Sequence, residues 1–211
     1  MQKDNCFLCT NLADRGGRLA LGHGLALTSD IAPLTLGHIL LHTDIHVNSF
    51  ASISQPMLRR WRDKILSLLD QPPLAGRDLL FFEHGTDGNG QVAAGCTDHA
   101  HIHVLPLSGE EKLISCAEQV IERLGPELTG PTLHFEELGN LKGKNYFWIA
   151  DKNLFLRLVT PTNPERQYLR RIVAEAIGRQ DHQTWDTFDE QQARATMDAW
   201  KGAIVQTGVE D

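Results

Sequence analysis

Runs of apolar residues with two different periods divide the chain into predicted strands and helices. Apolar, β-branched runs at 24–28 and 37–43 are separated by a short turn that contains Pro33, which predicts two consecutive strands. Between residues 55 and 69 the apolar positions recur with a 3.6-residue period opposite a charged face, which predicts an amphipathic helix. Two consecutive prolines follow and end this helix.

The rest of the pattern adds a strand at 79–83, a glycine-rich loop over 85–95 and a strand from 98 to 105 that Pro106 should end. Further elements follow in the C-terminal half: helices over 110–124, 168–177 and 190–203, and a hairpin of 146–150 with 154–159. Because strands do not alternate regularly with helices, the pattern predicts an antiparallel α+β arrangement rather than a parallel doubly wound sheet.

Composition narrows the class of protein. The 211 residues are 41% hydrophobic and 22% charged, which is typical of a globular chain. Twenty-seven acidic and 20 basic side chains give a net charge of −7, which argues against a broad basic surface that binds a nucleic-acid polymer. Such a chain can still bind a phosphate locally, through backbone amides and helix N-termini.

The sequence contains no segment with the roughly 18 consecutive apolar residues of a membrane helix. Its first six residues are polar and lack the apolar core of a signal peptide. We therefore expect a cytoplasmic protein with no membrane partner, in a reducing compartment. The cysteines are then expected to be thiols or metal ligands rather than disulfides: Cys6, Cys9, Cys96 and Cys116.

Histidines at alternate positions form the strongest chemical motif of the chain. His99, His101 and His103 would share one face of a strand, because side chains on a strand alternate between faces. Burying several imidazoles without partners costs desolvation free energy, so such a row indicates a site rather than packing. Two chemistries suit it: an imidazole that attacks phosphorus, or a His-x-His pair that holds a catalytic zinc with a third ligand. The glycines of the 85–95 loop favour phosphate, because they let backbone N–H groups approach an anion.

The segment Gly37-His38-Ile-Leu-Leu41, the glycine-rich loop and His99-Ala-His101-Ile-His103-Val-Leu-Pro106 together resemble the histidine-triad (HIT) superfamily of nucleotide hydrolases and transferases. The resemblance covers residues 5–107. It implies a HIT-like α+β fold with an antiparallel sheet flanked by helices, a homodimer, and cleavage at the α-phosphate of a nucleotide. We expect a HIT domain over 1–108 and an α/β C-terminal extension over 109–211 that holds the hairpin and helices.

The resemblance also implies roles for particular histidines. The middle histidine of the triad, His101, would be the nucleophile. His103 and the upstream His38 would contact the phosphate oxygens or steer protons. Gly95 in the glycine-rich loop and Thr97 just before the triad would contact the phosphate, although Thr97 can also be read as a hydroxyl at the start of a strand.

Two carboxylates occupy positions where the family binds nucleotide. Asp30 lies eight residues before His38, where an acid or amide usually holds the ribose, but it is equally well explained as a turn residue before Pro33. Glu83 stands where an Asn or Gln commonly contacts the nucleotide. A carboxylate there would repel phosphate unless it is protonated, bonded to ribose hydroxyls or paired with a cation.

The pair Cys6-x-x-Cys9 has the spacing of half a tetrahedral zinc site. A redox dithiol would need a preceding strand, and the few residues before Cys6 do not provide one. The arrangement is similar to that of a subset of triad proteins, which implies a structural zinc ion held by Cys6, Cys9, His46 and His99. The alternative is a pair of unliganded thiols.

The sequence therefore predicts a nucleotide hydrolase that acts on a dinucleoside polyphosphate or a nucleoside phosphoramidate through a covalent nucleotidyl-histidine. Hydrolysis is favoured because the third histidine, which the family's sugar-phosphate nucleotidyltransferases replace, is intact here as His103. The alternatives are a nucleotidyltransferase or phosphorylase of the same superfamily, a metal-dependent hydrolase with zinc on the triad, and a non-catalytic nucleotide-binding protein. The expected partners are a nucleotide and a second copy of the chain.

Some polar residues fit no motif and are expected on the surface or in packing roles. They are His23, His42, His84, His134 and His182. The basic group Arg166, Arg170 and Arg171 is interpreted as the solvated face of a helix, with contact to an anionic leaving group as the alternative.

Overall fold

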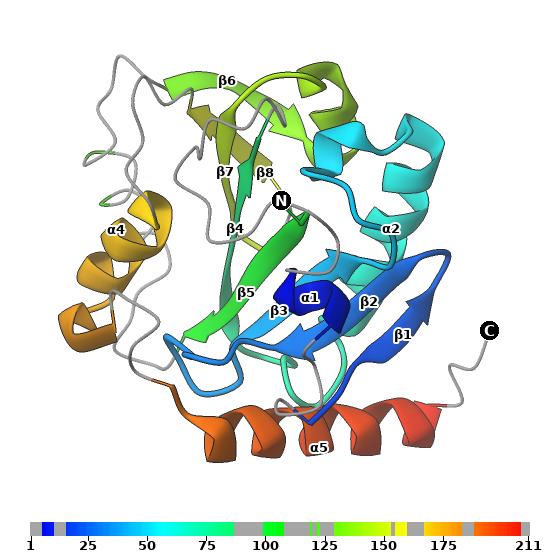
Figure 1. Cartoon of the computed structure of the whole chain (residues 1–211), viewed down its shortest axis with the longest axis vertical. Helices are drawn as coiled ribbons and strands as arrows, with labels where there is room; N and C mark the ends of the chain where they lie inside the picture. Colours follow the sequence, from blue (N-terminus) through cyan, green and yellow to red (C-terminus); the bar gives the residue numbers. More distant parts are fainter. Residues whose placement is uncertain are drawn as a thin grey trace.

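A computed structural model of the chain shows one antiparallel sheet with helices on both faces (Figure 1). The structure describes residues 6–10, 16–86, 99–107, 119, 122, 129–152, 155–159, 167–182 and 188–207. Most of the glycine-rich loop and of the predicted helix over 110–124 lies outside these residues.

Every pair of neighbouring strands among the described residues is antiparallel. The eight-stranded order in this part of the chain is β1-β2-β3-β5-β4-β7-β8-β6. The strands are β1 Leu19–Gly22, β2 Leu25–Ser29, β3 Ile39–Thr43, β4 Asp78–Gly85, β5 His101–Leu107, β6 Thr129–His134, β7 Tyr146–Ala150 and β8 Phe155–Val159. The predicted α+β class with an antiparallel sheet flanked by helices is confirmed.

The predicted end of the histidine strand is wrong. Strand β5 continues through Pro106, which lies opposite Leu79 of β4. On its other edge, β5 is paired with β3 only as far as Val104. Among the described residues, Pro106 therefore has a strand partner on one side only, and a missing N–H is tolerated there. At the other end, β5 begins at His101, so His99 precedes the strand.

The two faces of the sheet bury different helices. One face packs against the amphipathic helix α2 (Gln55–Leu68), the 3₁₀ helices η3 (Phe50–Ser52) and η5 (Phe135–Leu141), and Met197 and Trp200 of α5 (Glu190–Thr207). The opposite face carries His101 and His103, and we call it the histidine face. It is covered by α4 (Tyr168–Ala176) and by the short helix α1 (Phe7–Thr10), whose Leu8 packs on Leu40 of β3.

Residues beyond 108 complete the same sheet. Strand β7 pairs directly with β4, with Ile149 opposite Phe82. Helix α4 packs Leu169 and Val173 into the apolar cluster that contains Phe82. Figure 1 shows this helix beside the sheet. The domain boundary after residue 108 stays a prediction. The sheet contains strands from both sides of this boundary, and helix α4, from beyond it, covers the histidine face. None of the helices in the described part is long and apolar enough to cross a bilayer.

A close contact between β4 and β7 leaves no room for a side chain at Gly85. A Cβ atom there would lie 2.1 Å from the Cε1 and Cζ atoms of Tyr146. The Tyr146 ring cannot move freely, because its hydroxyl donates a hydrogen bond to Glu83 at 2.8 Å and accepts one from the Ala51 N–H at 3.3 Å. Glycine is therefore required at this position by packing.

We expect Gly85→Ala to lower the free energy of unfolding by about 1–3 kcal/mol, because the added methyl group must displace the fixed ring of Tyr146. Chemical denaturation measures the change. The control is Gly202→Ala in α5, where an added Cβ would meet nothing within 4 Å and alanine favours the helix. Equal stability of Gly85→Ala and wild type would contradict the packing argument.

Candidate functional site

The site is built where β3 and β5 lie side by side. His101 and His103 project from β5, and His38 immediately precedes β3. The Nε2 atom of His38 lies 2.9 Å from Nδ1 of His103, and the rings of His101 and His103 are 4.9 Å apart. Phe82 of β4 stacks on the His103 ring at 4.2 Å and 9°, which fixes the plane of that imidazole. The structure thus brings together the three histidines predicted for the reaction.

The hydrogen bond of His101 determines which of its nitrogens is available. Its Nδ1 lies 2.7 Å from the carbonyl oxygen of His99. Since a carbonyl only accepts hydrogen bonds, Nδ1 must carry a proton. In the neutral ring Nε2 then carries no proton and keeps its lone pair, which is the state that a nucleophile needs.

His38 and His103 are held in the opposite arrangement. The Leu34 N–H donates to Nδ1 of His38 at 3.1 Å, so a neutral His38 carries its proton on Nε2. That Nε2–H donates to Nδ1 of His103. A neutral His103 therefore carries its own proton on Nε2, from which it can donate a hydrogen bond to a ligand.

Burial keeps both rings of this pair neutral. Desolvation lowers the pKa of His38 to about 4, against the opposing charge of Asp30. Desolvation also lowers the pKa of His103 well below its usual value, with the charges of His101, His38 and Arg170 acting in the same direction. The proton arrangement described above is therefore the one that holds at neutral pH.

Asp30 lies beside this pair because the β2–β3 ladder continues past the ends of the two strands. Its N–H donates to the His38 carbonyl at 3.3 Å. The Oδ2 atom is 3.5 Å from Nδ1 of His103 and 3.8 Å from Nε2 of His38. The two imidazole nitrogens are closer to each other, at 2.9 Å, so the Nε2–H of His38 donates to His103 rather than to Asp30. The other carboxylate oxygen, Oδ1, accepts a hydrogen bond from the Ala32 N–H at 2.8 Å.

The carboxylate of Asp30 also pairs with Arg170 of α4, whose Nη1 lies 3.2 Å from Oδ2. Arg170 is only 2% exposed, so the interpretation of this residue as part of a solvated helix face is wrong. The apolar positions around it pack α4 against the sheet and carry its guanidinium inward. No signal in the sequence distinguishes Arg170 from its neighbours Arg166 and Arg171. Asp30 is itself 2% exposed, and its ribose role stays a prediction.

The structure does not bring Glu83 to the histidines. Register places Glu83 opposite Ile102, and residues opposite each other in a sheet share a face, so Glu83 points away from the histidine face. Its carboxylate is fully buried and accepts hydrogen bonds from the Phe50 N–H and the Tyr146 hydroxyl, both at 2.8 Å. The other two residues predicted to contact nucleotide, Gly95 and Thr97, lie outside the described residues.

A second group of side chains lies next to the histidine row. The ligand atoms of Cys6, Cys9, His46 and His99 all lie within 4.8 Å of one another. The Nδ1 atom of His99 is 3.4 Å from both cysteine sulfurs, and Nδ1 of His46 is 3.4 Å from that of Cys9. Tetrahedral zinc with ordinary bond lengths places N and S ligands about 3.5 Å apart. This group therefore fits a metal ion of that kind.

The protonation state of His99 also suits a metal. Its Nε2 lies 2.7 Å from the carbonyl oxygen of Thr43, so Nε2 carries the proton and Nδ1 offers a lone pair to the cysteine side. A backbone carbonyl on the far nitrogen is the usual way in which proteins orient a histidine ligand. The metal ligands predicted from the sequence are thus brought together by the fold.

The triad itself does not form one metal site. The Nδ1 atom of His99 faces the cysteines, while His101 and His103 lie toward His38. Asp30, His38 and His103 also have ligand atoms within 4.8 Å of one another. However, the 2.9 Å between the His38 and His103 nitrogens is a hydrogen-bond distance, whereas two nitrogens on tetrahedral zinc lie about 3.4 Å apart.

His42 is a neighbour of the site that the sequence interpretation missed. It lies directly opposite His101 in the β3–β5 ladder and is completely buried. Its Nδ1 is 3.1 Å from the Thr43 carbonyl oxygen, and burial lowers its pKa to about 3. The alternation of His38, Leu40 and His42, from the residue before β3 into the strand, is the signal that places His42 on the histidine face.

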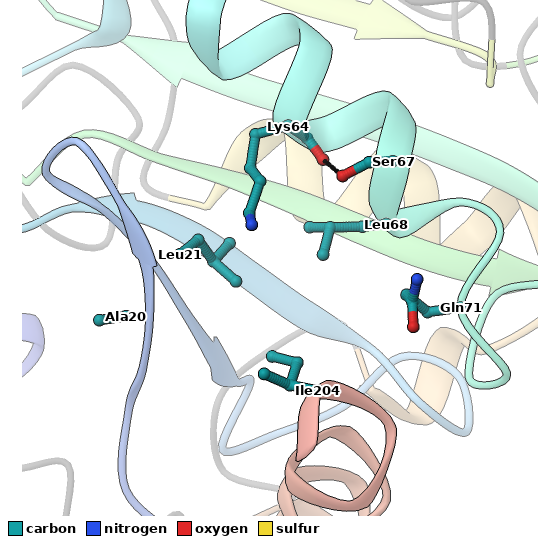
Figure 2. Close-up of a pocket in the computed structure, with 7 residues that line it drawn as sticks. All are labelled: Ala20, Leu21, Lys64, Ser67, Leu68, Gln71 and Ile204. Atoms are coloured by element: carbon teal, nitrogen blue, oxygen red, sulfur yellow. Dashed lines mark hydrogen bonds between the residues drawn. The ribbon is translucent and has the colours of Figure 1, made fainter. Parts of the chain in front are cut away.

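A small cavity lies away from this site (Figure 2). It is formed between β1, α2 and α5 and has a volume of about 20 Å³, which is room for roughly one water molecule. The residues that line it are Ala20, Leu21, Lys64, Ser67, Leu68, Gln71 and Ile204. Because α2 covers the face opposite the histidines, this cavity is not part of the candidate site.

No protein-family model and no curated protein matches the chain. Nine chains of solved structures match it. One is a HIT-like protein involved in cell-cycle regulation from Bartonella henselae, 16% identical, with a TM-score of 0.35 over 49% of this chain and 80% of that one. Another is a hypothetical histidine triad nucleotide-binding protein from Sulfolobus tokodaii, 18% identical, with a TM-score of 0.34 over 87% of this chain and 99% of that one. Likenesses of this size decide nothing about the chemistry, which rests on the side chains described above.

The buried Glu83 predicts a pH dependence of stability. Desolvation raises its pKa to about 7, against the hydrogen bonds from Phe50 and Tyr146. Between pH 4.5 and 7 the folded state then keeps a proton that the unfolded state loses, so this carboxyl makes stability fall as the pH rises. Its contribution to the fall is on the order of 2–3 kcal/mol.

We expect Glu83→Gln to be more stable relative to wild type at pH 8 than at pH 5, because the amide stays neutral at both. Denaturant unfolding at the two pH values measures this difference. Glu190→Gln, at an exposed position of α5, is the control and should show a difference that is constant with pH. A constant difference for Glu83→Gln as well would mean that Glu83 is ionised in the folded protein at pH 5.

Proposed function

We propose that the chain is a nucleotide hydrolase that cleaves at the α-phosphate through a nucleotide bound covalently to His101. The observation that carries this proposal is the complementary proton arrangement of two neighbouring rings. Nε2 of His101 has a lone pair, because Nδ1 donates to the His99 carbonyl. Nε2 of His103 carries a proton, because Nδ1 accepts from His38.

In the first step, Nε2 of His101 attacks the α-phosphorus. The new P–N bond forms as the bond between the α-phosphorus and the leaving group breaks, and the leaving group departs with the electron pair. The His101 ring then carries a positive charge, which its Nδ1–H shares with the His99 carbonyl. His103 donates a hydrogen bond from Nε2–H toward the charge that develops on the phosphoryl oxygens. Water next attacks the α-phosphorus, and the P–N bond breaks with its electron pair returning to Nε2 of His101. A nucleoside monophosphate is released, and the proton lost by the attacking water passes to the solvent.

The neutral state of His38 and His103 limits which leaving groups can depart, because neither ring can readily protonate one. A neutral imidazole stabilises charge by donating a hydrogen bond, but it has no acidic proton to give at neutral pH. A leaving group that is stable as an anion needs no such proton. We therefore favour a dinucleoside polyphosphate over a nucleoside phosphoramidate as the substrate class, since an amine must be protonated as it leaves.

We further propose that zinc binds to Cys6, Cys9, His46 and His99. Such an ion would supply a cross-link and no chemistry in the reaction, because it would tie helix α1 to His99, two residues before β5. His99 connects the two sites: its side chain belongs to the metal group, while its carbonyl accepts the hydrogen bond from His101. A fixed His99 thus fixes the ring of the nucleophile.

The nucleophile is tested by His101→Gln. We expect turnover of diadenosine polyphosphates to fall by about three orders of magnitude or more, since no covalent intermediate can form. An acid-labile adduct with the mass of a nucleotidyl group, which is a nucleoside monophosphate less one water, should be trapped on wild type and be absent from the variant. His23→Asn, at an exposed turn, is the histidine control. An adduct that persists in His101→Gln would contradict the assignment.

The metal is tested by the double substitution Cys6→Ser, Cys9→Ser. We expect the protein purified with zinc to lose about one metal ion per chain and its Tm to fall by about 10 °C or more, because the cross-link is lost. Elemental analysis and thermal unfolding measure both effects. Cys116→Ser serves as the cysteine control. Full metal content in the double variant would place the ion elsewhere, with Asp30, His38 and His103 as the next group to test.

We also propose a homodimer and a cytoplasmic location. The dimer is a proposal taken from the family resemblance, and light scattering of the purified chain tests it.

A further inference from the structure

Arg170 connects the C-terminal part of the chain to the histidine site. Its side chain extends from α4 into the protein, where Nη1 pairs with Asp30 Oδ2 at 3.2 Å and Nη2 donates to the Ala32 carbonyl. Both Arg170 and Asp30 are 2% exposed. The apolar contacts of α4 with β4 and β7 hold the helix in place. Arg170 therefore reaches the site from a rigid element.

The charge balance around His38 and His103 depends on this arginine. The charged and titratable groups that act on this pair among the described residues are Asp30, Arg170 and His101. One carboxylate and one guanidinium cancel, so both imidazoles can be neutral. Without the guanidinium, the carboxylate would be a single buried negative charge beside two imidazoles, and such a charge attracts a proton.

An added proton would break the contact between the two rings. Both Nδ1 atoms of the pair accept a hydrogen bond, that of His38 from the Leu34 N–H and that of His103 from His38. An added proton would go to Nδ1 of His103, because this atom is the one beside the carboxylate, 3.5 Å from Asp30 Oδ2. A proton there would point at the Nε2–H of His38. Two donors facing each other at 2.9 Å repel, and the hydrogen bond between the rings would be lost.

We propose that Arg170 is a positioning residue of the histidine site, which by pairing with Asp30 preserves the hydrogen bond between His38 and His103. Helix α4 then contributes a residue to the histidine site in addition to covering it. The proposal rests on the proposed function only for its effect on turnover. Its effect on the two imidazoles is independent of any reaction.

The test uses the full-length protein with ¹⁵N-labelled histidine, and NMR reports the protonation of each ring nitrogen as the pH is varied from 5 to 8. In wild type we expect His38 and His103 to stay neutral over this range. In Arg170→Gln, which can still donate to the Ala32 carbonyl, we expect the pair to take up a proton within it. The double variant Arg170→Gln, Asp30→Asn should return to the neutral pair, because the carboxylate charge is gone.

Turnover provides the second measurement. We expect kcat of Arg170→Gln to fall at least tenfold at pH 7, and the double variant to recover at least part of the loss. Arg179→Gln, just beyond α4 and ion-paired with Asp181 near the surface, is the matched control and should behave as wild type. If wild type forms no nucleotidyl adduct at His101 but the NMR result is the expected one, the proposed function is rejected. The positioning role of Arg170 is then still supported.

Rescue by Asp30→Asn is the decisive outcome, since a merely structural arginine would not be rescued by removing its partner. If Arg170→Gln does not fold, the same logic applies to folding: the double variant should fold. Unchanged protonation of the histidines in a folded Arg170→Gln protein would overturn the proposal. So would a double variant that is as impaired as the single one.

Discussion

The hydrogen bond from the His101 ring to the carbonyl of His99 is the interaction on which the account of the site depends. It sets the proton on Nδ1 and leaves a lone pair on Nε2. Since the side chain of His99 lies among Cys6, Cys9 and His46, one residue joins a group that could hold a metal to His101, the proposed nucleophile. Helix α1 and strand β5 are thereby parts of one arrangement.

The opposite side of the site depends on a helix that is more than 60 residues later in the chain. Arg170 of α4 balances the charge of Asp30, and with that balance His38 can donate to His103. Burial costs free energy for each of these polar groups, and the cost is met by pairing them with one another. The neutral histidines that result are suited to holding charge on phosphorus rather than to protonating a leaving group.

Local patterns were sufficient to predict six of the eight described strands, the helices α2, α4 and α5 and the histidine row, because period and motif spacing determine these features directly. Strands β1 and β6 were not predicted. Spacing pointed to a metal site only at Cys6 and Cys9, and the grouping of this pair with His46 and His99 came from the family resemblance. Long-range packing was not accessible in this way. Glu83 is in the motif region but turns to the far face through its register with Ile102, and Arg170 looks like any basic residue on a helix. Pro106 was predicted to end its strand because the loss of a neighbouring strand at Val104 cannot be read from sequence.

The measurement that tests the central claim most directly is the tautomer of His101, observed by long-range ¹H–¹⁵N NMR on the unliganded protein at neutral pH and assigned by its loss in His101→Gln. The account predicts a proton on Nδ1 and an unprotonated Nε2. A proton on Nε2 would contradict it, because the ring would then have no lone pair facing the ligand.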